Sequence, residues 1–179
     1  MRFTPTRVSG AFIVESEPHA DERGFFLVLW AQSEFRRQGL ATEFAQSSVA
    51  YNRARGTLRG MHYQTPPHQE AKLVRCAAGA NLGANRWRRR ESRRDSPSFK
   101  TWVSVELSAE NRRMLYVPEG CAHGYLTLTD ETEIFYHASA EYAPQFGGGV
   151  RWNDPAFAVE WPFAPVVINA RDRDYPDFR

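Results

Sequence analysis

The chain has 179 residues, of which 42% are hydrophobic, 13% aromatic and 25% charged, and its formal net charge is +2. This composition excludes a disordered, low-complexity or collagen-like chain, and we expect a single domain over residues 1–179. The sequence contains no run of 18 apolar residues, so no membrane span is predicted, and the N-terminus has no signal-peptide pattern. Two cysteines, Cys76 and Cys121, are expected to be buried, reduced thiols of a cytoplasmic protein.

Strand-like segments dominate the first half of the chain. Apolar or alternating runs at 24–30, 57–64 and 71–80 are typical of β-strands. The segment 31–41 is instead predicted to be a helix. Its expected N-cap is Ser33, and Gly39 is expected to end it.

The segment 81–94, NLGANRWRRRESRR, differs from everything around it. Residues 86–94 hold six arginines and one glutamate, or +5, so the rest of the chain sums to −3. Burying several unpaired charges is prohibitive, so we expect this segment to loop out of the fold. A basic arm for RNA or phosphates is the alternative, but no nucleic-acid-binding module surrounds it, and no nucleic-acid partner is expected.

Further strands are predicted beyond the Arg-rich segment. Residues 101–108 alternate between polar and apolar side chains, and strand-like runs follow at 113–118, 124–129 and 132–142. Short strands separated by Gly, Pro and Asp predict an all-β sandwich or barrel with a few short helices. The tail beyond Trp161 is expected to hold a short helix or turns.

A cationic cluster lies on two neighbouring predicted strands. Alternation on strand 57–64 places Arg59 and His62 on opposite faces, and the next strand offers Lys72, one of only two lysines in the chain. His, Arg and Lys side chains that converge inside a barrel suit an anionic ligand or a developing oxyanion. The alternative is a hydrogen-bonded core histidine beside an exposed lysine.

A second cluster is the turn 118–124, PEGCAHG, which places His123 at the start of a strand. It resembles the second half of the cupin signature, in which that histidine is a metal ligand. The first half needs a His-x-His pair, but Gln64 stands at the second position, so a bound metal is not expected. The side chains that could still assemble as nitrogen and oxygen ligands are His62, His68, Glu70 and His123.

Two groups late in the chain add catalytic potential. Tyr136 shares a strand face with Ile134, so its ring is expected to reach the interior, where a tyrosine can serve as a general acid. Asp172, in the sequence NARD, offers a carboxylate that could orient an imidazole and stabilise its cation.

These clusters stand in longer strings that resemble the dTDP-4-dehydrorhamnose 3,5-epimerase family. The strings are RGTLRGMHYQTPPHQEAKLVRCAAGA, DSPSF, VELSAENRRMLYVPEGCAHGYLTL, TEIFYHASAEYAP and RWNDPAFAVEWP. The similarity runs from about Arg23 to Asp172, in order. It implies a cupin-type jelly roll, a homodimer with exchanged N-terminal strands, a dTDP-sugar substrate, and neither metal nor organic cofactor.

The resemblance also implies roles for individual residues. His62 matches the catalytic base, Asp172 the aspartate that pairs with it, Tyr136 the acid on the opposite face of the sugar, and Lys72 the lysine near the keto oxygen. The residues expected to bind substrate are Arg23 at the diphosphate, Arg59, Gln46, His123 and Tyr142.

The chemistry of these residues agrees with that resemblance. Epimerisation beside a ketone needs a base on one face of the sugar, an acid on the other and a cation for the enolate. We therefore expect an isomerase that inverts C3, C5 or both of a dTDP-4-dehydro-6-deoxyhexose, in lipopolysaccharide or antibiotic-sugar biosynthesis. The alternatives are a mono-epimerase, a metal-dependent cupin oxygenase and an inactive sugar-nucleotide binder.

The chain departs from the family pattern at several positions. Val28 replaces a usual Glu, His137 replaces a Lys, and Gln46-Ser47-Ser48 replaces Gln-Asp-Asn. The largest departure is 81–94, where the family has a strand resembling VFDVAVDLR with two aspartates. Such an abrupt change is the pattern that paired compensating frameshifts would give.

Overall fold

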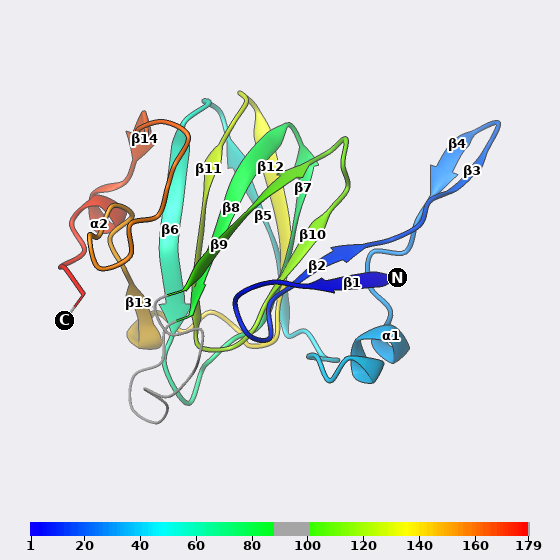
Figure 1. The fold of residues 1–179 in the computed structure, drawn as a ribbon, viewed down its shortest axis with the longest axis horizontal. Helices are drawn as coiled ribbons and strands as arrows, with labels where there is room; N and C mark the ends of the chain where they lie inside the picture. The colour runs from blue at the N-terminus through cyan, green and yellow to red at the C-terminus, as the bar shows by residue number, and fades with distance from the viewer. Residues whose placement is uncertain (88–100, 179) are drawn as a thin grey trace.

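The structure is a computed structural model that describes residues 1–87 and 101–178. Two six-stranded β-sheets face each other, and short helices lie at their margins (Figure 1). The strand pairs within the described residues are antiparallel, except for one short parallel pair near the C-terminus. This architecture confirms the predicted all-β sandwich.

Each sheet combines segments that are distant in sequence. In spatial order the first contains β1 (Arg2–Pro5), β2 (Phe12–Glu15), β10 (Met114–Val117), β7 (Lys72–Ala78), β12 (Thr132–Ala138) and β5 (Gln46–Asn52). The second contains β13 (Gly147–Gly149), β6 (Thr57–Gln64), β11 (Cys121–Thr127), β8 (Ala80–Trp87) and β9 (Trp102–Ser108), with β14 (Val167–Ile168) beside β6. The remaining elements are the hairpin β3 (His19–Asp21) and β4 (Gly24–Phe26), the helices α1 (Gln32–Arg37) and α2 (Ala170–Arg173), and the 3₁₀ turn Pro144–Phe146.

The main core lies between the two sheets. On β9, Val105 and Leu107 are buried and Glu106 is exposed, as the alternation in the sequence predicted. The same core contains Cys76 and Cys121, both free and buried. Burial raises the pKa of both thiols, so they behave as small apolar side chains.

A second apolar cluster lies beneath α1 and is centred on the buried Phe35. The helix begins after Ala31, whose extended backbone serves as the N-cap without a side-chain hydrogen bond. The prediction of Ser33 as N-cap is wrong, because Ser33 lies inside the first turn. The predicted end is confirmed: Gly39 has a φ of 67° and its N–H donates to the carbonyl of Arg36.

The prediction that 81–94 loops out is wrong for residues 81–87. These residues belong to β8, which pairs with β11 on one side and β9 on the other. The first five residues of the segment, 81–85, carry no charge, so they can enter the sheet, and Arg86 is the one arginine of the segment within β8. The rest of the segment, 88–94, lies outside the described residues.

The β3–β4 hairpin extends away from the two sheets (Figure 1). All six residues of its two strands are exposed, and Phe25 and Phe26 leave 52% and 68% of their surface accessible. Only β4 lies within the strand predicted at 24–30, and the chain is irregular from residue 27 to 30. In the part of the chain that the structure describes, no helix is long and apolar enough to cross a membrane.

The register between β6 and β11 shifts by one residue. His62 pairs with His123 whereas Arg59 pairs with Tyr125, so three steps along β6 face two along β11. Such a bulge reverses the alternation of side chains, and Arg59 and His62 therefore face the same cavity. The prediction that placed them on opposite faces is wrong for this reason.

Gly60 makes this bulge sterically feasible. Its φ is 124°, and a Cβ at this position would lie 2.5 Å from the Cα of Gly124. We expect Gly60→Ala to lower the free energy of unfolding by about 2–4 kcal/mol in urea denaturation. Gly39→Ala is the control, because Gly39 has open space around it and only the left-handed backbone cost of about 1 kcal/mol applies. Equal losses in the two variants would contradict this account of the bulge.

Candidate active site

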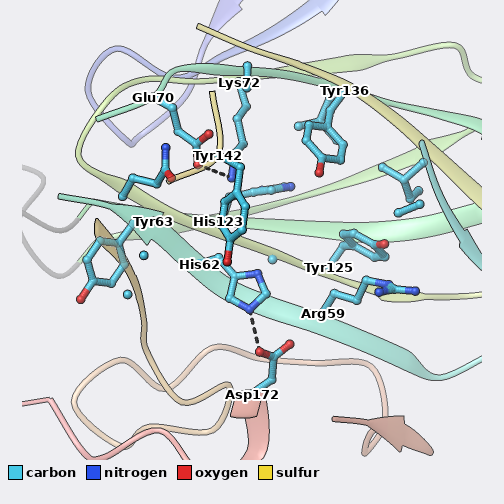
Figure 2. A pocket seen from close by; sticks show the side chains of 18 of the residues that line it. Arg59, His62, Tyr63, Glu70, Lys72, His123, Tyr125, Tyr136, Tyr142 and Asp172 are labelled. Carbon is cyan, nitrogen blue, oxygen red and sulfur yellow. Dashed lines mark hydrogen bonds and ion pairs between the residues drawn. The ribbon is translucent and has the colours of Figure 1, made fainter. Parts of the chain in front are cut away.

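A cavity of about 360 Å³ lies between the two sheets (Figure 2). The first sheet contributes side chains from β5, β7 and β12, and the second from β6 and β11. The sequence-predicted site residues that line the cavity are Gln46, Arg59, His62, Lys72, His123, Tyr136, Tyr142 and Asp172. The fold therefore brings together eight of the nine residues, from strands, a loop and the helix α2 that are far apart in the chain.

A pair formed by His62 and Asp172 lies on the β6 side of the cavity. His62 Nε2 is 2.6 Å from Asp172 Oδ1, and the imidazole is 36% exposed while the carboxylate is fully buried. Asp172 is the third residue after Asn169, the N-cap of α2, whose side chain accepts a hydrogen bond from the Asp172 N–H. The tail beyond Trp161, expected to hold a short helix or turns, thus contains the helix α2, which places the carboxylate beneath the imidazole.

The ionisation state of Asp172 determines which nitrogen of the His62 imidazole carries a proton and which can accept one. Burial acts to raise the pKa of this carboxyl, but hydrogen bonds from His62 and from the Gly60 N–H outweigh it, so the net pKa lies below the usual range. An ionised carboxylate can only accept hydrogen bonds, so Nε2 of His62 carries the proton. In the neutral imidazole, Nδ1 then has a free lone pair, which is the arrangement required of a base.

Lys72 and Tyr136 lie on the opposite wall of the cavity (Figure 2). Lys72 Nζ is 2.9 Å from Glu70 Oε1 and 6.0 Å from the centre of the Tyr136 ring. Tyr136 and Ile134 both line the cavity, as the shared strand face predicted. Because the two sheets face each other, the ammonium and the phenol lie across the cavity from the imidazole.

Arg59 is held at the β6 wall by a buried asparagine. Its Nε donates to Asn52 Oδ1 at 2.8 Å, and Tyr125 donates its hydroxyl to the same oxygen at 3.3 Å. Burial raises the pKa of Tyr125 to about 12, so its phenol stays protonated. The hydrogen bond to Asn52 therefore holds the Arg59 guanidinium in place at the cavity wall.

Gln46 and Gln64 fix the loop that carries Tyr142. Gln46 accepts the Tyr142 N–H at 3.1 Å, and Gln64 accepts the Ala143 N–H at 2.6 Å while donating to the Glu141 carbonyl. Both side-chain amides therefore use part of their hydrogen-bonding capacity on the backbone of residues 141–143. Polar lining residues that sequence reasoning did not consider for the site include Tyr63, Gln64, Tyr125, Asn169 and Arg171. These residues have in common only that they line the cavity, and no short sequence motif predicts that position.

Arg23 is the predicted site residue that does not reach the cavity. It lies on the exposed β3–β4 hairpin, where its guanidinium pairs with Asp21. The hairpin extends away from its own sheets, so within one chain Arg23 cannot contact a ligand in the cavity (Figure 1).

The four donors of the metal-site alternative are not assembled. No group of three His, Cys, Asp or Glu side chains suited to a metal ion occurs within the described residues. His68 instead stacks on Phe146 with ring centres 4.4 Å apart, and Glu70 pairs with Lys72. This geometry does not favour the metal-dependent oxygenase.

Comparison with known proteins gives one consistent result. A family model described as dTDP-4-dehydrorhamnose 3,5-epimerase matches residues 5–179. The Salmonella typhimurium enzyme of that name is 38% identical over 173 residues, which cover 96% of this chain and 92% of the relative. The Bacillus anthracis enzyme, whose crystal structure has TDP and PPi bound, has a TM-score of 0.91 at 34% identity and covers 99% of both chains.

A further structural relative comes from Streptomyces bikiniensis. A 3'-monoepimerase from Streptomyces bikiniensis, in complex with dTDP-quinovose, has a TM-score of 0.86 at 31% identity over 97% of this chain and 86% of that one. The fold and the matches together define a cupin-type sugar epimerase. This chain belongs to the dTDP-4-dehydrorhamnose 3,5-epimerase family, as the sequence resemblance predicted.

His123 gives the fold a defined dependence on pH. Burial, together with the positive charge of Lys72, lowers the pKa of His123 to about 3, against a hydrogen bond to the Ala84 backbone that raises it. The unfolded chain takes up a proton at His123 below about pH 6.5, whereas the folded chain does not. The stability that depends on neutral His123 is therefore complete above that pH and is lost as the pH falls toward 3.

The size of this effect can be measured. Between about pH 7.5 and pH 5.5, His123 is expected to account for about 1.4 kcal/mol of lost unfolding free energy. Urea denaturation at the two pH values should show a smaller loss in His123→Gln than in the wild type. An unchanged pH dependence in the variant would contradict a neutral, buried His123.

Proposed function

We propose that this chain inverts C3 and C5 of dTDP-4-dehydro-6-deoxyglucose and so forms dTDP-4-dehydro-L-rhamnose. The observation that carries the proposal is the His62–Asp172 pair on one wall of a cavity whose other wall holds Lys72 and Tyr136. The TDP and dTDP-quinovose bound to two relatives support a dTDP-sugar as the substrate.

The reaction begins with removal of a proton from a carbon next to the C4 ketone. Nδ1 of His62 takes this proton, and the resulting imidazolium is stabilised by the carboxylate of Asp172, 2.6 Å from Nε2. The electron pair of the broken C–H bond moves into the enolate, and the negative charge develops on the C4 oxygen. The Lys72 ammonium lies where it can stabilise that oxygen.

Inversion requires that the proton return from the other face. Tyr136 donates its phenolic proton to the same carbon from the wall opposite His62, which re-forms the ketone with inverted configuration. The net result is one proton accepted by His62 and one lost by Tyr136, and exchange with solvent restores both groups. The same sequence at the second carbon completes a double epimerisation.

The cations along the cavity suit the diphosphate. Arg59 lines the wall beside Tyr125, and its planar guanidinium can make paired hydrogen bonds to phosphate oxygens. The open ring face of Tyr142, which is 55% exposed, offers a stacking surface for a base.

We further propose that the protein works as a homodimer in which the β3–β4 hairpin reaches the second copy. An isolated two-stranded hairpin with exposed aromatic residues is marginally stable alone. A complementary apolar face exists on the edge strand β5, where Val49 and Tyr51 are 57% and 51% exposed. Because β1 and β2 pair within their own sheet, the hairpin is the part left to exchange, and it would carry Arg23 to the partner's cavity.

The most direct test of the reaction uses deuterated water. Incubation with dTDP-4-dehydro-6-deoxyglucose in D₂O, followed by NMR, should show deuterium at both C3 and C5 and formation of the L-rhamno product. Exchange at C3 alone would support the second candidate, a 3'-mono-epimerase like the Streptomyces bikiniensis relative. Exchange at neither carbon would end the epimerase proposal.

The roles of the two walls can be separated by two variants. His62→Asn removes the base, so both exchange and inversion should fall by about 10³-fold or more. Tyr136→Phe keeps the base, so it should retain C–H exchange with solvent while losing inversion. Equal loss of exchange in the two variants would contradict the assignment of base and acid to opposite walls.

Mixed dimers test whether Arg23 acts in the partner's site. Arg23→Ala and His62→Asn homodimers should both be nearly inactive. Unfolding and refolding them together in equal amounts should restore about a quarter of wild-type activity, because half of the dimers are mixed and each has one intact site. No recovery, or a monomer in sedimentation, would contradict the exchanged hairpin.

A further inference from the structure

We propose that Glu70 is a positioning residue for this reaction, because it fixes the Lys72 ammonium at the place where the C4 oxygen of the sugar acquires negative charge. The inference rests on the proposed function and adds a residue that the resemblance did not assign to catalysis. Sequence reasoning considered Glu70 only as a ligand in the metal-site alternative.

Glu70 lies two residues before Lys72, the first residue of β7, and faces the same cavity. The side chains of Glu70, Lys72 and Val74 all line the cavity, whereas Ala71 and Leu73 pack into the apolar cluster beneath α1. Ala71 still hydrogen-bonds to Ser139, so the chain stays extended just before β7 and the alternation of side chains continues to Glu70. The carboxylate and the ammonium therefore start from neighbouring positions on one wall. Figure 2 shows the two side chains meeting above His62.

The contact is a largely buried ion pair. Glu70 Oε1 is 2.9 Å from Lys72 Nζ, and the two side chains are only 10% and 15% exposed. An ammonium at such depth needs a counter-charge, because burying it alone costs several kcal/mol. Among the described residues that line the cavity, Asp172 is the other acid, and it is engaged by His62 and Gly60. Glu70 is therefore the partner of Lys72.

The pair matters for catalysis because lysine is flexible. Its four-carbon stem allows many positions for the charge, and stabilisation of an enolate depends on a charge held in place before the reaction. The ion pair occupies one of the three ammonium donors and leaves two for the cavity. The 6.0 Å distance from Nζ to the Tyr136 ring centre places this charge beside the proposed acid.

Kinetics of Glu70→Gln test the inference. The amide keeps the shape but loses the charge, so kcat should fall by about 10-fold or more while KM stays within about 3-fold, since the contact acts on the developing charge. Glu70→Asp, which keeps the charge on a shorter stem, should recover part of kcat. Glu110→Gln, at an exposed turn away from the cavity, is the control and should match the wild type.

A double-mutant cycle tests whether Glu70 acts through Lys72. In a Lys72→Met background, Glu70→Gln should cause little further loss of kcat, because the group that Glu70 positions is gone. Equal losses in both backgrounds, or an unchanged kcat in a folded Glu70→Gln enzyme, would overturn the inference. If Glu70→Gln does not fold, the kcat of Glu70→Asp decides: a loss supports the inference and wild-type kcat overturns it.

The same assays separate this inference from the proposed function. A wild-type protein that does not exchange C3 or C5 protons refutes the proposed function itself. An active wild type with fully active Glu70 variants refutes only the role of Glu70.

Discussion

A single buried carboxylate, that of Asp172, joins the parts of the chain on which the site depends. It accepts the Gly60 N–H at 3.0 Å and pairs with His62 Nε2 at 2.6 Å, while its own N–H is capped by Asn169. The contact therefore fixes the C-terminal helix α2 to the bulge of β6. It also sets the imidazole tautomer, because an ionised carboxylate requires a proton on Nε2. The position of the proposed base, His62, and the nitrogen that carries its proton thus have the same origin.

The two-sheet architecture supplies the second constraint. Inversion at a carbon needs a base and an acid on opposite faces of the sugar, and two facing sheets provide opposite walls. The β6 wall carries His62, and the wall of β7 and β12 carries Lys72 and Tyr136.

Most strands and the lining of the cavity could be predicted from sequence, because alternation and punctuation are local signals. The bulge beside Gly60 could not, since it depends on the backbone of β11 approaching within contact distance. The strand at 81–87 was also missed, because the charge of the whole segment outweighed its uncharged beginning. Arg23 illustrates a third limit: its motif was visible, but its distance from the cavity depends on the projecting hairpin.

The central claim is that Asp172 holds His62 with a protonated Nε2 and a free Nδ1. It can be measured by ¹⁵N–¹H NMR of the histidine rings in the free enzyme at neutral pH, with His62 assigned by loss of its signals in His62→Asn. The account predicts a proton on Nε2 and the shift of a bare nitrogen at Nδ1, and predicts that Asp172→Asn disturbs this pattern. A neutral His62 with its proton on Nδ1 would contradict it.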